Sequence, residues 1–187
     1  MTKIRVIQPE EATGRLEEIY TDLIGKRGKL AEVHKIQSLR PESIVKHMDL
    51  YLEIMFSKSE LSRAEREMMA VVVSANNDCR YCQIHHAEAL NNYWKDEEKV
   101  NQLRNNFKDV LLTEKEVALC EYATYLTLTP GGEKEGKSVE KLKQLGFDDS
   151  AILDATLVIS YFNFVNRIVL SLGVEVEAES GASGYNY

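Results

Sequence analysis

The scarcity of chain-breaking residues is what most limits the fold of this sequence: 187 residues include only three prolines and ten glycines. In the long stretches between them, apolar residues recur at intervals of three and four rather than two. That spacing puts apolar side chains on one face of a helix, whereas strand residues alternate between two faces. The sequence therefore predicts an all-α fold, a helical bundle of about eight to nine helices.

Length and charge narrow the class of protein. A chain of this length suits one domain, residues 1–187, with a core that needs neither metal nor disulfides. Acidic residues outnumber basic ones by 30 to 23, and this argues against a nucleic-acid or anionic-membrane partner, which would require clustered Lys and Arg. The first residues lack the apolar core of a signal peptide, and no apolar run approaches the roughly 18 residues of a membrane span. We expect a cytoplasmic protein.

Start and stop signals place the helices along the chain. Ser62 and Glu65 form a capping-box pattern, and Asp78 or Asn77 is expected to cap the helix that begins with Cys79. The predicted helices span, approximately, residues 11–26, 42–56, 62–76, 79–94, 96–106, 113–125, 138–145 and 152–172.

The C-terminal part of the sequence carries three further expectations. Phe147-Asp-Asp-Ser aligns with Leu61-Ser-Arg-Ala, which suggests a repeated helical hairpin whose second copy has no cysteines. The last predicted helix is expected to break near Asn163 or Asn166. The tail 175–187, rich in Ser and Gly, is expected to be mobile or to contact a neighbouring subunit.

Two thiols and two imidazoles gather in Cys79-Arg-Tyr-Cys82-Gln-Ile-His85-His86. Cys82 and His86 are four residues apart, so they share a helix face and should touch. Both cysteines lie near the start of the helix, where unpaired N–H groups and the positive end of the dipole favour a thiolate. A second thiol can then capture the oxidised form of the first. Because thiols are kept reduced in the cytoplasm, the pair predicts redox chemistry there rather than a structural disulfide.

Two other interpretations of the cysteines remain open. A zinc site needs four ligands, whereas the pair and one adjacent histidine supply three, and His34 and His47 are distant in sequence. The second interpretation is that the two cysteines of the pair are buried by chance and carry no chemistry. Cys120 lies inside an apolar helix, and there we expect a packing role alone. Because the ligands are too few, we predict no bound metal. No Gly-x-Gly-x-x-Gly fingerprint of a flavin or nicotinamide site occurs, so we also predict no cofactor and expect the electrons to come from a partner.

Together these residues resemble a known family. Residues 61–94 carry Leu61-Ser-Arg-Ala-Glu-Arg-Glu67, Val71-Val-Val-Ser74, Cys79-Arg-Tyr-Cys82 and His86, which is similar to the core motif of the alkylhydroperoxidase D-like, carboxymuconolactone decarboxylase superfamily. In those proteins a Glu twelve residues before the first Cys joins the Cys pair and the His. The segments Pro9-Glu-Glu-Ala-Thr-Gly-Arg-Leu16 and Asn163-Phe-Val-Asn-Arg167 also resemble its peroxidase-related branch.

The resemblance implies a thiol-dependent hydroperoxide reductase with four catalytic residues. Cys82 would be the peroxidatic thiol, Cys79 the resolving thiol, and Glu67 with His86 a proton relay. It also implies a hydroperoxide substrate, an external dithiol reductant of lipoyl or thioredoxin-like type, and a homo-oligomer, either a trimer or a hexamer.

Several neighbouring residues carry separate expectations. Better-known peroxidases of the family often have a His directly before the second Cys, whereas Tyr81 stands there in this chain. His85 is expected to be a surface or packing residue. Arg167, inside an apolar segment, is expected to hold Glu67, to contact a subunit or to reach solvent. The aromatic run 161–164 is expected in the core or an interface, with one ring a candidate for lining a peroxide pocket.

Three alternative functions stay open at this stage. A thiol-disulfide oxidoreductase acting on proteins would use the same pair, although the strand and helix alternation of a thioredoxin fold is missing. A non-enzymatic oligomeric redox sensor would form its disulfide once, without turnover. A decarboxylase of the carboxymuconolactone type is disfavoured because both thiols are retained.

Overall fold

The computed structural model describes residues 2–132 and 136–177, and within these ranges it contains nine α-helices, two short 3-10 segments and no strand. The all-α prediction is confirmed. The helices are α1 (Arg15–Arg27), α2 (Glu32–Lys35), α3 (Pro41–Phe56), α4 (Arg63–Asn76), α5 (Arg80–Trp94), α6 (Glu97–Asn105), α7 (Glu114–Leu128), α8 (Lys137–Gln144) and α9 (Asp149–Leu172). The 3-10 segments are η1 (Pro9–Glu11) and η2 (Phe107–Asp109).

Several helix starts follow the capping signals in the sequence. Ser62 caps α4 in a complete capping box with Glu65, and Thr113 does the same for α7. Asp148 accepts a hydrogen bond from the Ala151 N–H at the start of α9. These bonds satisfy backbone donors that the first helical turn leaves unpaired.

The N-terminal region departs most from the predicted boundaries. The first predicted helix starts late because η1 ends at Glu11, and Gly14 takes a positive φ of 55° before α1 begins at Arg15. The short helix α2 was not predicted, because four residues are too few for a helical period to be recognised in a sequence.

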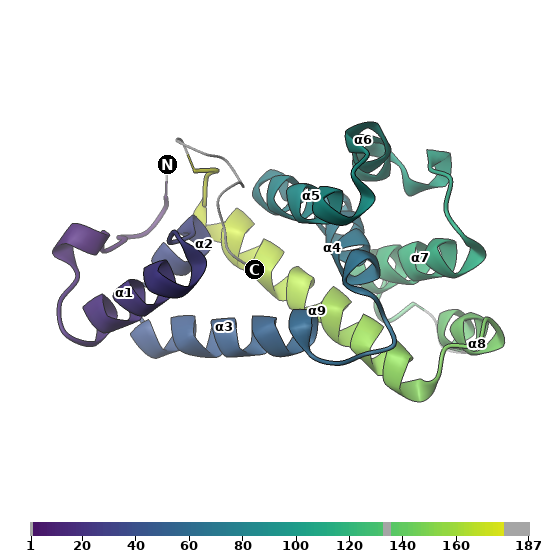
Figure 1. Ribbon diagram of the computed structural model, residues 1–187, viewed down its shortest axis with the longest axis horizontal. Helices are drawn as coiled ribbons and strands as arrows, with labels where there is room; N and C mark the ends of the chain where they lie inside the picture. The colour runs from purple at the N-terminus through teal and green to yellow at the C-terminus, as the bar shows by residue number, and fades with distance from the viewer. Residues whose placement is uncertain (1, 133–135, 178–187) are drawn as a thin grey trace.

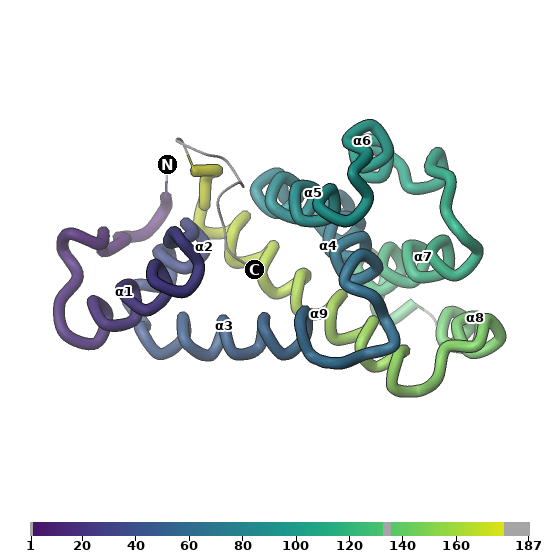
Figure 2. The backbone as a smooth tube through the Cα atoms, in the orientation of Figure 1, coloured from purple at the N-terminus to yellow at the C-terminus, as the bar shows by residue number. Residues whose placement is uncertain are grey.

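Helix α4 lies at the centre of the bundle and packs against α5, α7 and α9 (Figure 1). Its residues 66–74 are all buried, which explains why this stretch is apolar around most of the helix. Helices α1 to α3 form one end of the molecule and α5 to α8 the other, with α9 contacting both groups (Figure 2). The motif that resembles the family core therefore begins on the most enclosed helix of the fold.

Helix α9 is continuous, which corrects the expectation of a break near Asn163 or Asn166. The Asn163 amide donates to the Ile159 carbonyl one turn earlier and to Thr127 on α7, so it ties the helix to a neighbour rather than ending it. One uninterrupted helix stands where the suggested repeat requires two, so the repeat is not seen.

By length and composition alone, α9 could cross a membrane, which differs from the expectation that no apolar run is long enough. Many of its apolar side chains, however, pack inside the bundle. They form the core with α3, α4 and α7, and the Lys3 N–H bonds the Leu172 carbonyl at 2.9 Å where α9 ends. Burial within the bundle therefore accounts for part of the apolar sequence of α9, whereas Leu157 and Phe164 on the same helix are exposed.

Candidate active site

The two thiols of the Cys pair are in contact at the start of α5. Their Sγ atoms lie 2.7 Å apart, and the residues are only 0% and 1% exposed. Asp78 takes a positive φ of 52° between α4 and α5, and the Cys79 N–H donates to the Ser74 carbonyl at 2.9 Å. This sharp turn puts Cys79 itself at the N-cap position, which corrects the expected cap by Asp78 or Asn77. Cys82 follows in the first turn.

The thiols differ in how readily each loses its proton. Burial raises the pKa of the Cys82 thiol well above its usual value, the contact with Cys79 raises it further, and the Asn166 amide opposes the rise. The hydrogen bond between the two thiols lowers the pKa of Cys79, against the effect of burial. Cys79 therefore has the lower pKa of the two thiols, and Cys82 needs a neighbouring base to become a thiolate. This differs from the sequence expectation, because burial of Cys82 outweighs the helix dipole.

Glu67 and His86 form a buried hydrogen-bonded pair. The Glu67 carboxylate is 0% exposed and accepts from His86 Nδ1 at 2.7 Å and from Arg63 Nη2 at 2.7 Å. Arg63 also donates to the Met55 carbonyl at 2.6 Å and stacks 3.6 Å above the Phe56 ring. A carboxylate held by a guanidinium is a fixed acceptor, so it selects the His86 tautomer protonated at Nδ1. The Nε2 atom of His86 is then the basic nitrogen.

Cys82 and His86 line the same small cavity, of about 60 Å³. We call Cys82 and His86, together with Glu67 behind them, the thiol wall. Cys79 does not line this cavity, so a small molecule entering it meets Cys82 first. A larger cavity of about 490 Å³ lies between α1 and α3, but no cysteine or histidine lines it, so the smaller cavity is the candidate site.

A second set of polar side chains lies at another side of this cavity, and we call it the tyrosine wall: His47 and Tyr161, which line the cavity, and Gln37 behind them. His47 Nε2 and the Tyr161 hydroxyl are 2.7 Å apart, and Gln37 Nε2 lies 2.7 Å from His47 Nδ1. Burial lowers the pKa of His47 to about 4, with the charge of Arg27 adding to the effect. His47 is therefore neutral at physiological pH. The expectation that a ring from the aromatic run 161–164 lines the pocket is confirmed for Tyr161 and Phe162.

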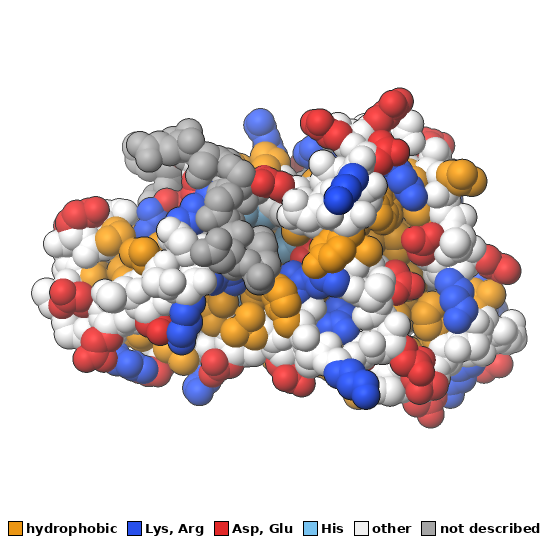
Figure 3. Space-filling model, in the orientation of Figure 1, with side chains coloured by type: hydrophobic (Ala, Val, Ile, Leu, Met, Phe, Trp, Pro, Cys, Tyr) orange, Lys and Arg blue, Asp and Glu red, His pale blue; other side chains and the backbone are white. Residues whose placement is uncertain are grey.

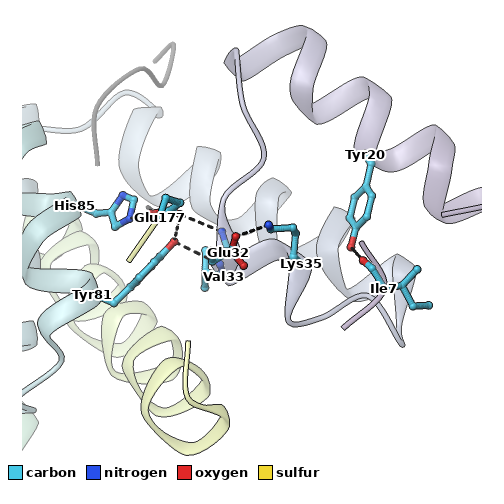
Figure 4. A network of polar contacts seen from close by, with 8 residues as sticks. All are labelled: Ile7, Tyr20, Glu32, Val33, Lys35, Tyr81, His85 and Glu177. Carbon is cyan, nitrogen blue, oxygen red and sulfur yellow. Dashed lines mark hydrogen bonds and ion pairs between the residues drawn. The ribbon is translucent and has the colours of Figure 1, made fainter. Parts of the chain in front are cut away.

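Glu177, just beyond α9, joins the Cys motif to the N-terminal helices (Figure 4). Its carboxylate accepts from His85 Nε2 at 2.9 Å, from the Tyr81 hydroxyl at 2.9 Å and from the Glu32 N–H at 3.0 Å. Burial alone would raise the pKa of Glu177, but His85 and the Glu32 N–H lower it to about 2. Tyr81, between the two cysteines, is thus anchored by the C-terminal segment.

The contacts of Glu177 and the burial of His85 test the sequence expectations for the C-terminal tail and for His85. His85 is buried and lines the cavity, so it is a packing residue and not a surface one. Glu177 contacts its own chain, whereas the rest of the predicted mobile tail, residues 178–187, lies outside the described residues.

Behind the thiols lies a cluster of amide and hydroxyl groups. The buried Asn166 on α9 donates to Ser74 Oγ on α4 at 3.3 Å and accepts from Asn77 Nδ2 at 3.0 Å. Asn166 thus crosslinks α9 to the turn that carries the cysteines. Its amide also acts on the Cys82 thiol, a contact that sequence reasoning missed because the two residues are far apart in the chain.

All four histidines of the chain line the cavity, together with Cys82. Within residues 2–132 and 136–177, however, no three His, Cys, Asp or Glu side chains are grouped so that they could hold a metal ion. The described part of the site is therefore arranged around hydrogen bonds between side chains.

Comparison with known proteins shows which family and which solved structures this chain is similar to. The profile of the carboxymuconolactone decarboxylase family matches residues 43–125, which include α4 and α5. A peroxidase-related protein from Silicibacter sp. TM1040 superposes with a TM-score of 0.83 and 26% identity over 98% of both chains. Over residues 43–125 the chain is therefore similar to the carboxymuconolactone decarboxylase family, and its fold is shared with a peroxidase-related protein.

Two further solved structures share this fold. A peroxidase-related protein with an alkylhydroperoxidase AhpD core from Ralstonia eutropha JMP134 matches with a TM-score of 0.84 and 22% identity, over 95% of this chain and 93% of the other. The debrominase Bmp8 matches with a TM-score of 0.77 and 19% identity, over 95% and 94%. At these identities the likeness concerns the fold.

The structure also places two other residues that carried expectations from the sequence, Arg167 and Cys120. Arg167 is exposed and donates to Asn163 on its own helix, so it reaches solvent and Arg63 holds Glu67 instead. Cys120 is buried in α7, and burial raises the pKa of its thiol. It is therefore an inert packing residue.

Proposed function

We propose that this protein is a thiol-dependent hydroperoxide reductase. The observation that carries the proposal is the contact of two buried thiols beside a Glu67–His86 pair, with Cys82 at a cavity large enough for a hydroperoxide head. About 60 Å³ equals roughly two water molecules, which suits an –OOH group whose organic part lies toward the opening. Two of the structures with this fold are peroxidase-related proteins, which agrees with this chemistry.

The reaction begins when His86 Nε2 takes the proton from Cys82. The Cys82 thiolate attacks the terminal oxygen of ROOH, the O–O bond breaks, and Cys82 becomes a sulfenic acid. The leaving RO⁻ receives the proton that the thiol lost, so ROH departs. Cys79 then attacks the Cys82 sulfur, water leaves and a Cys79–Cys82 disulfide forms.

The burial of both thiols limits which reductants can reach them, and it also limits whether the pair can act on the disulfides of other proteins. A folded partner cannot bring its own cysteine onto a pair that is 0% and 1% exposed, whereas a slender dithiol on a flexible arm can enter a small cavity. We therefore favour a lipoyl-type reductant over a thioredoxin-like one. The same argument disfavours a general protein thiol-disulfide oxidoreductase.

A homo-oligomer, trimer or hexamer, in a reducing cytoplasm remains part of the proposal. Support for self-association comes from exposed apolar residues on α3 and α9, such as Leu52, Leu157 and Phe164, each at least 41% exposed. Figure 3 shows hydrophobic side chains gathered on this face where α3 and α9 meet. Single exposed apolar residues are ordinary, but a gathered set is typical of an interface.

The test is turnover with a defined reductant. Reduced protein is mixed with excess cumene hydroperoxide and dihydrolipoamide, and peroxide loss is followed over many equivalents, with Cys120→Ala as the matched control. We expect sustained loss in both proteins. A disulfide that forms once without turnover would identify a redox sensor, and absence of any oxidation would return the decarboxylase and other chemistries to consideration.

A further inference from the structure

The tyrosine wall contains more polar groups than packing requires. His47 and Tyr161 line an otherwise largely aromatic cavity, and two 2.7 Å contacts join His47 to Tyr161 and to Gln37 behind it. Buried polar groups of this kind are retained when each one is satisfied, and they then fix the positions of hydrogens. None of the three belongs to the Glu67–His86 pair, so their arrangement requires a separate explanation.

The orientation of the Gln37 amide sets the direction of the chain of hydrogen bonds. Gln37 Nε2 lies 2.8 Å from the Val33 carbonyl, which can only accept, so the nitrogen and not the oxygen of the amide points there. The second hydrogen of the same NH₂ group then points to His47 Nδ1, 2.7 Å away. His47 Nδ1 is therefore an acceptor and carries no proton.

This tautomer determines what the Tyr161 hydroxyl can do. A neutral His47 that is unprotonated at Nδ1 carries its proton on Nε2 and donates it to the Tyr161 oxygen at 2.7 Å. His47 stays neutral because burial lowers its pKa to about 4, and burial raises the pKa of Tyr161 well above its usual value. Tyr161 thus remains a neutral hydroxyl whose oxygen is satisfied and whose own proton is not used by His47.

We propose that the Tyr161 hydroxyl donates its hydrogen bond to the leaving oxygen of the hydroperoxide, with His47 and Gln37 as positioning residues that hold its proton toward the cavity. Tyr161 and Cys82 line the same cavity, so a bound ROOH contacts both. As the O–O bond breaks, negative charge develops on RO, and a preorganised donor stabilises it there. Tyr161 keeps its proton, because the proton that ends on ROH is the one removed from Cys82. This inference rests on the proposed peroxidase function.

The test compares two electrophiles that differ in whether the leaving group needs a donor. Cys79→Ser isolates Cys82, and Tyr161→Phe in that background removes only the hydroxyl. Cumene hydroperoxide releases a strongly basic alkoxide, whereas methyl methanethiosulfonate releases a weakly basic sulfinate. The rates of Cys82 oxidation and of Cys82 thiomethylation are measured by mass spectrometry in both proteins.

We expect Tyr161→Phe to slow oxidation by the hydroperoxide roughly 10- to 100-fold and to change thiomethylation less than about twofold. An equal loss with both reagents would assign Tyr161 to packing or to the thiolate and would overturn the inference. Unchanged rates with both reagents would overturn it as well. If Cys82 with Tyr161 intact is thiomethylated but not oxidised by the hydroperoxide, the proposed function itself fails.

A second measurement needs no variant. Nitrogen-15 NMR of the histidine-labelled protein at neutral pH reports which ring nitrogen of His47 carries the proton. We expect the Nε2–H tautomer, with His47 remaining neutral until the pH approaches about 4. An Nδ1–H tautomer or an imidazolium at neutral pH would overturn the inference, because the Tyr161 proton would then be committed to His47 or the Gln37 contact would be misassigned.

Discussion

The thiol wall and the tyrosine wall line one cavity but are built in different ways. The thiol wall comes from two consecutive helices, and its longest spacing, Glu67 to His86, is 19 residues. The tyrosine wall joins α3 to α9 through His47 and Tyr161, which are 114 residues apart. The reacting groups of the proposed chemistry are thus encoded locally, whereas the groups proposed to contact the leaving oxygen come together only through the tertiary fold.

Removing the thiols should have the largest effect on activity. Cys82→Ser should abolish peroxide consumption because it removes the nucleophile, while Cys79→Ser should allow one turnover and leave a sulfenic acid on Cys82. Peroxide loss and trapping of the sulfenate by dimedone, followed by mass spectrometry, measure both outcomes. Equal loss in the two variants without a trapped sulfenate would contradict the assignment of roles, and Cys120→Ala serves as the control.

Substitution of the buried acid should have the next largest effect. Glu67→Gln removes the carboxylate that orients His86 and should lower the rate of Cys82 oxidation about 100-fold. It also leaves the guanidinium of Arg63 without its charged partner, which should cost about 3 kcal/mol or more in unfolding free energy, because breaking a buried ion pair is expensive.

The control for this prediction is Arg167→Ala, which removes an exposed guanidinium. It should change the unfolding free energy by less than about 0.5 kcal/mol, as expected for a surface position. Chemical denaturation and stopped-flow oxidation measure the two quantities. If Glu67→Gln were as stable and as fast as Arg167→Ala, the thiol wall would not depend on Glu67.

Loss of the Glu177 contact should have the smallest effect on rate. We expect Glu177→Gln to change peroxide oxidation less than about threefold, because Glu177 anchors Tyr81 and His85 without joining the proton path. Its effect should appear in stability. The folded-state pKa of Glu177 is lowered from 4.5 to about 2, so its charge stabilises the fold above about pH 4.5, and this is lost as the pH falls through about 2.

Thermal unfolding at a series of pH values tests this prediction. Wild type should exceed Glu177→Gln in stability at neutral pH, and the difference should shrink between about pH 4.5 and 2. The exposed Glu60→Gln is the matched control and should follow wild type throughout. A constant difference across this pH range would contradict an ionised Glu177 in the C-terminal segment.

The same contrast explains which features could be predicted from the sequence. Capping signals such as Ser62 with Glu65 and the fixed spacing of Glu67, the Cys pair and His86 are local, so they identified α4, α5 and the thiol wall. Gln37 and His47 offered no motif, and the polar role of Tyr161 depends on partners from distant helices.

The direction of the Cys82 pKa shift was missed for the same reason. The expected effect of the helix dipole is a property of α5 alone, whereas burial is set by α4 and α9 packing around the thiol. Arg63 was likewise overlooked in favour of Arg167, because the exposure of each guanidinium follows from the tertiary fold.

The central claim is that Cys82 and Cys79 form a redox couple driven by a hydroperoxide, and the mass of the peptide that contains both residues tests it most directly. One equivalent of cumene hydroperoxide is added to the reduced protein, the remaining thiols are alkylated, and the peptide is weighed before and after treatment with dihydrolipoamide. We predict a loss of two hydrogens that dihydrolipoamide reverses. A peptide that remains fully alkylated at both cysteines after exposure to the hydroperoxide would contradict the account.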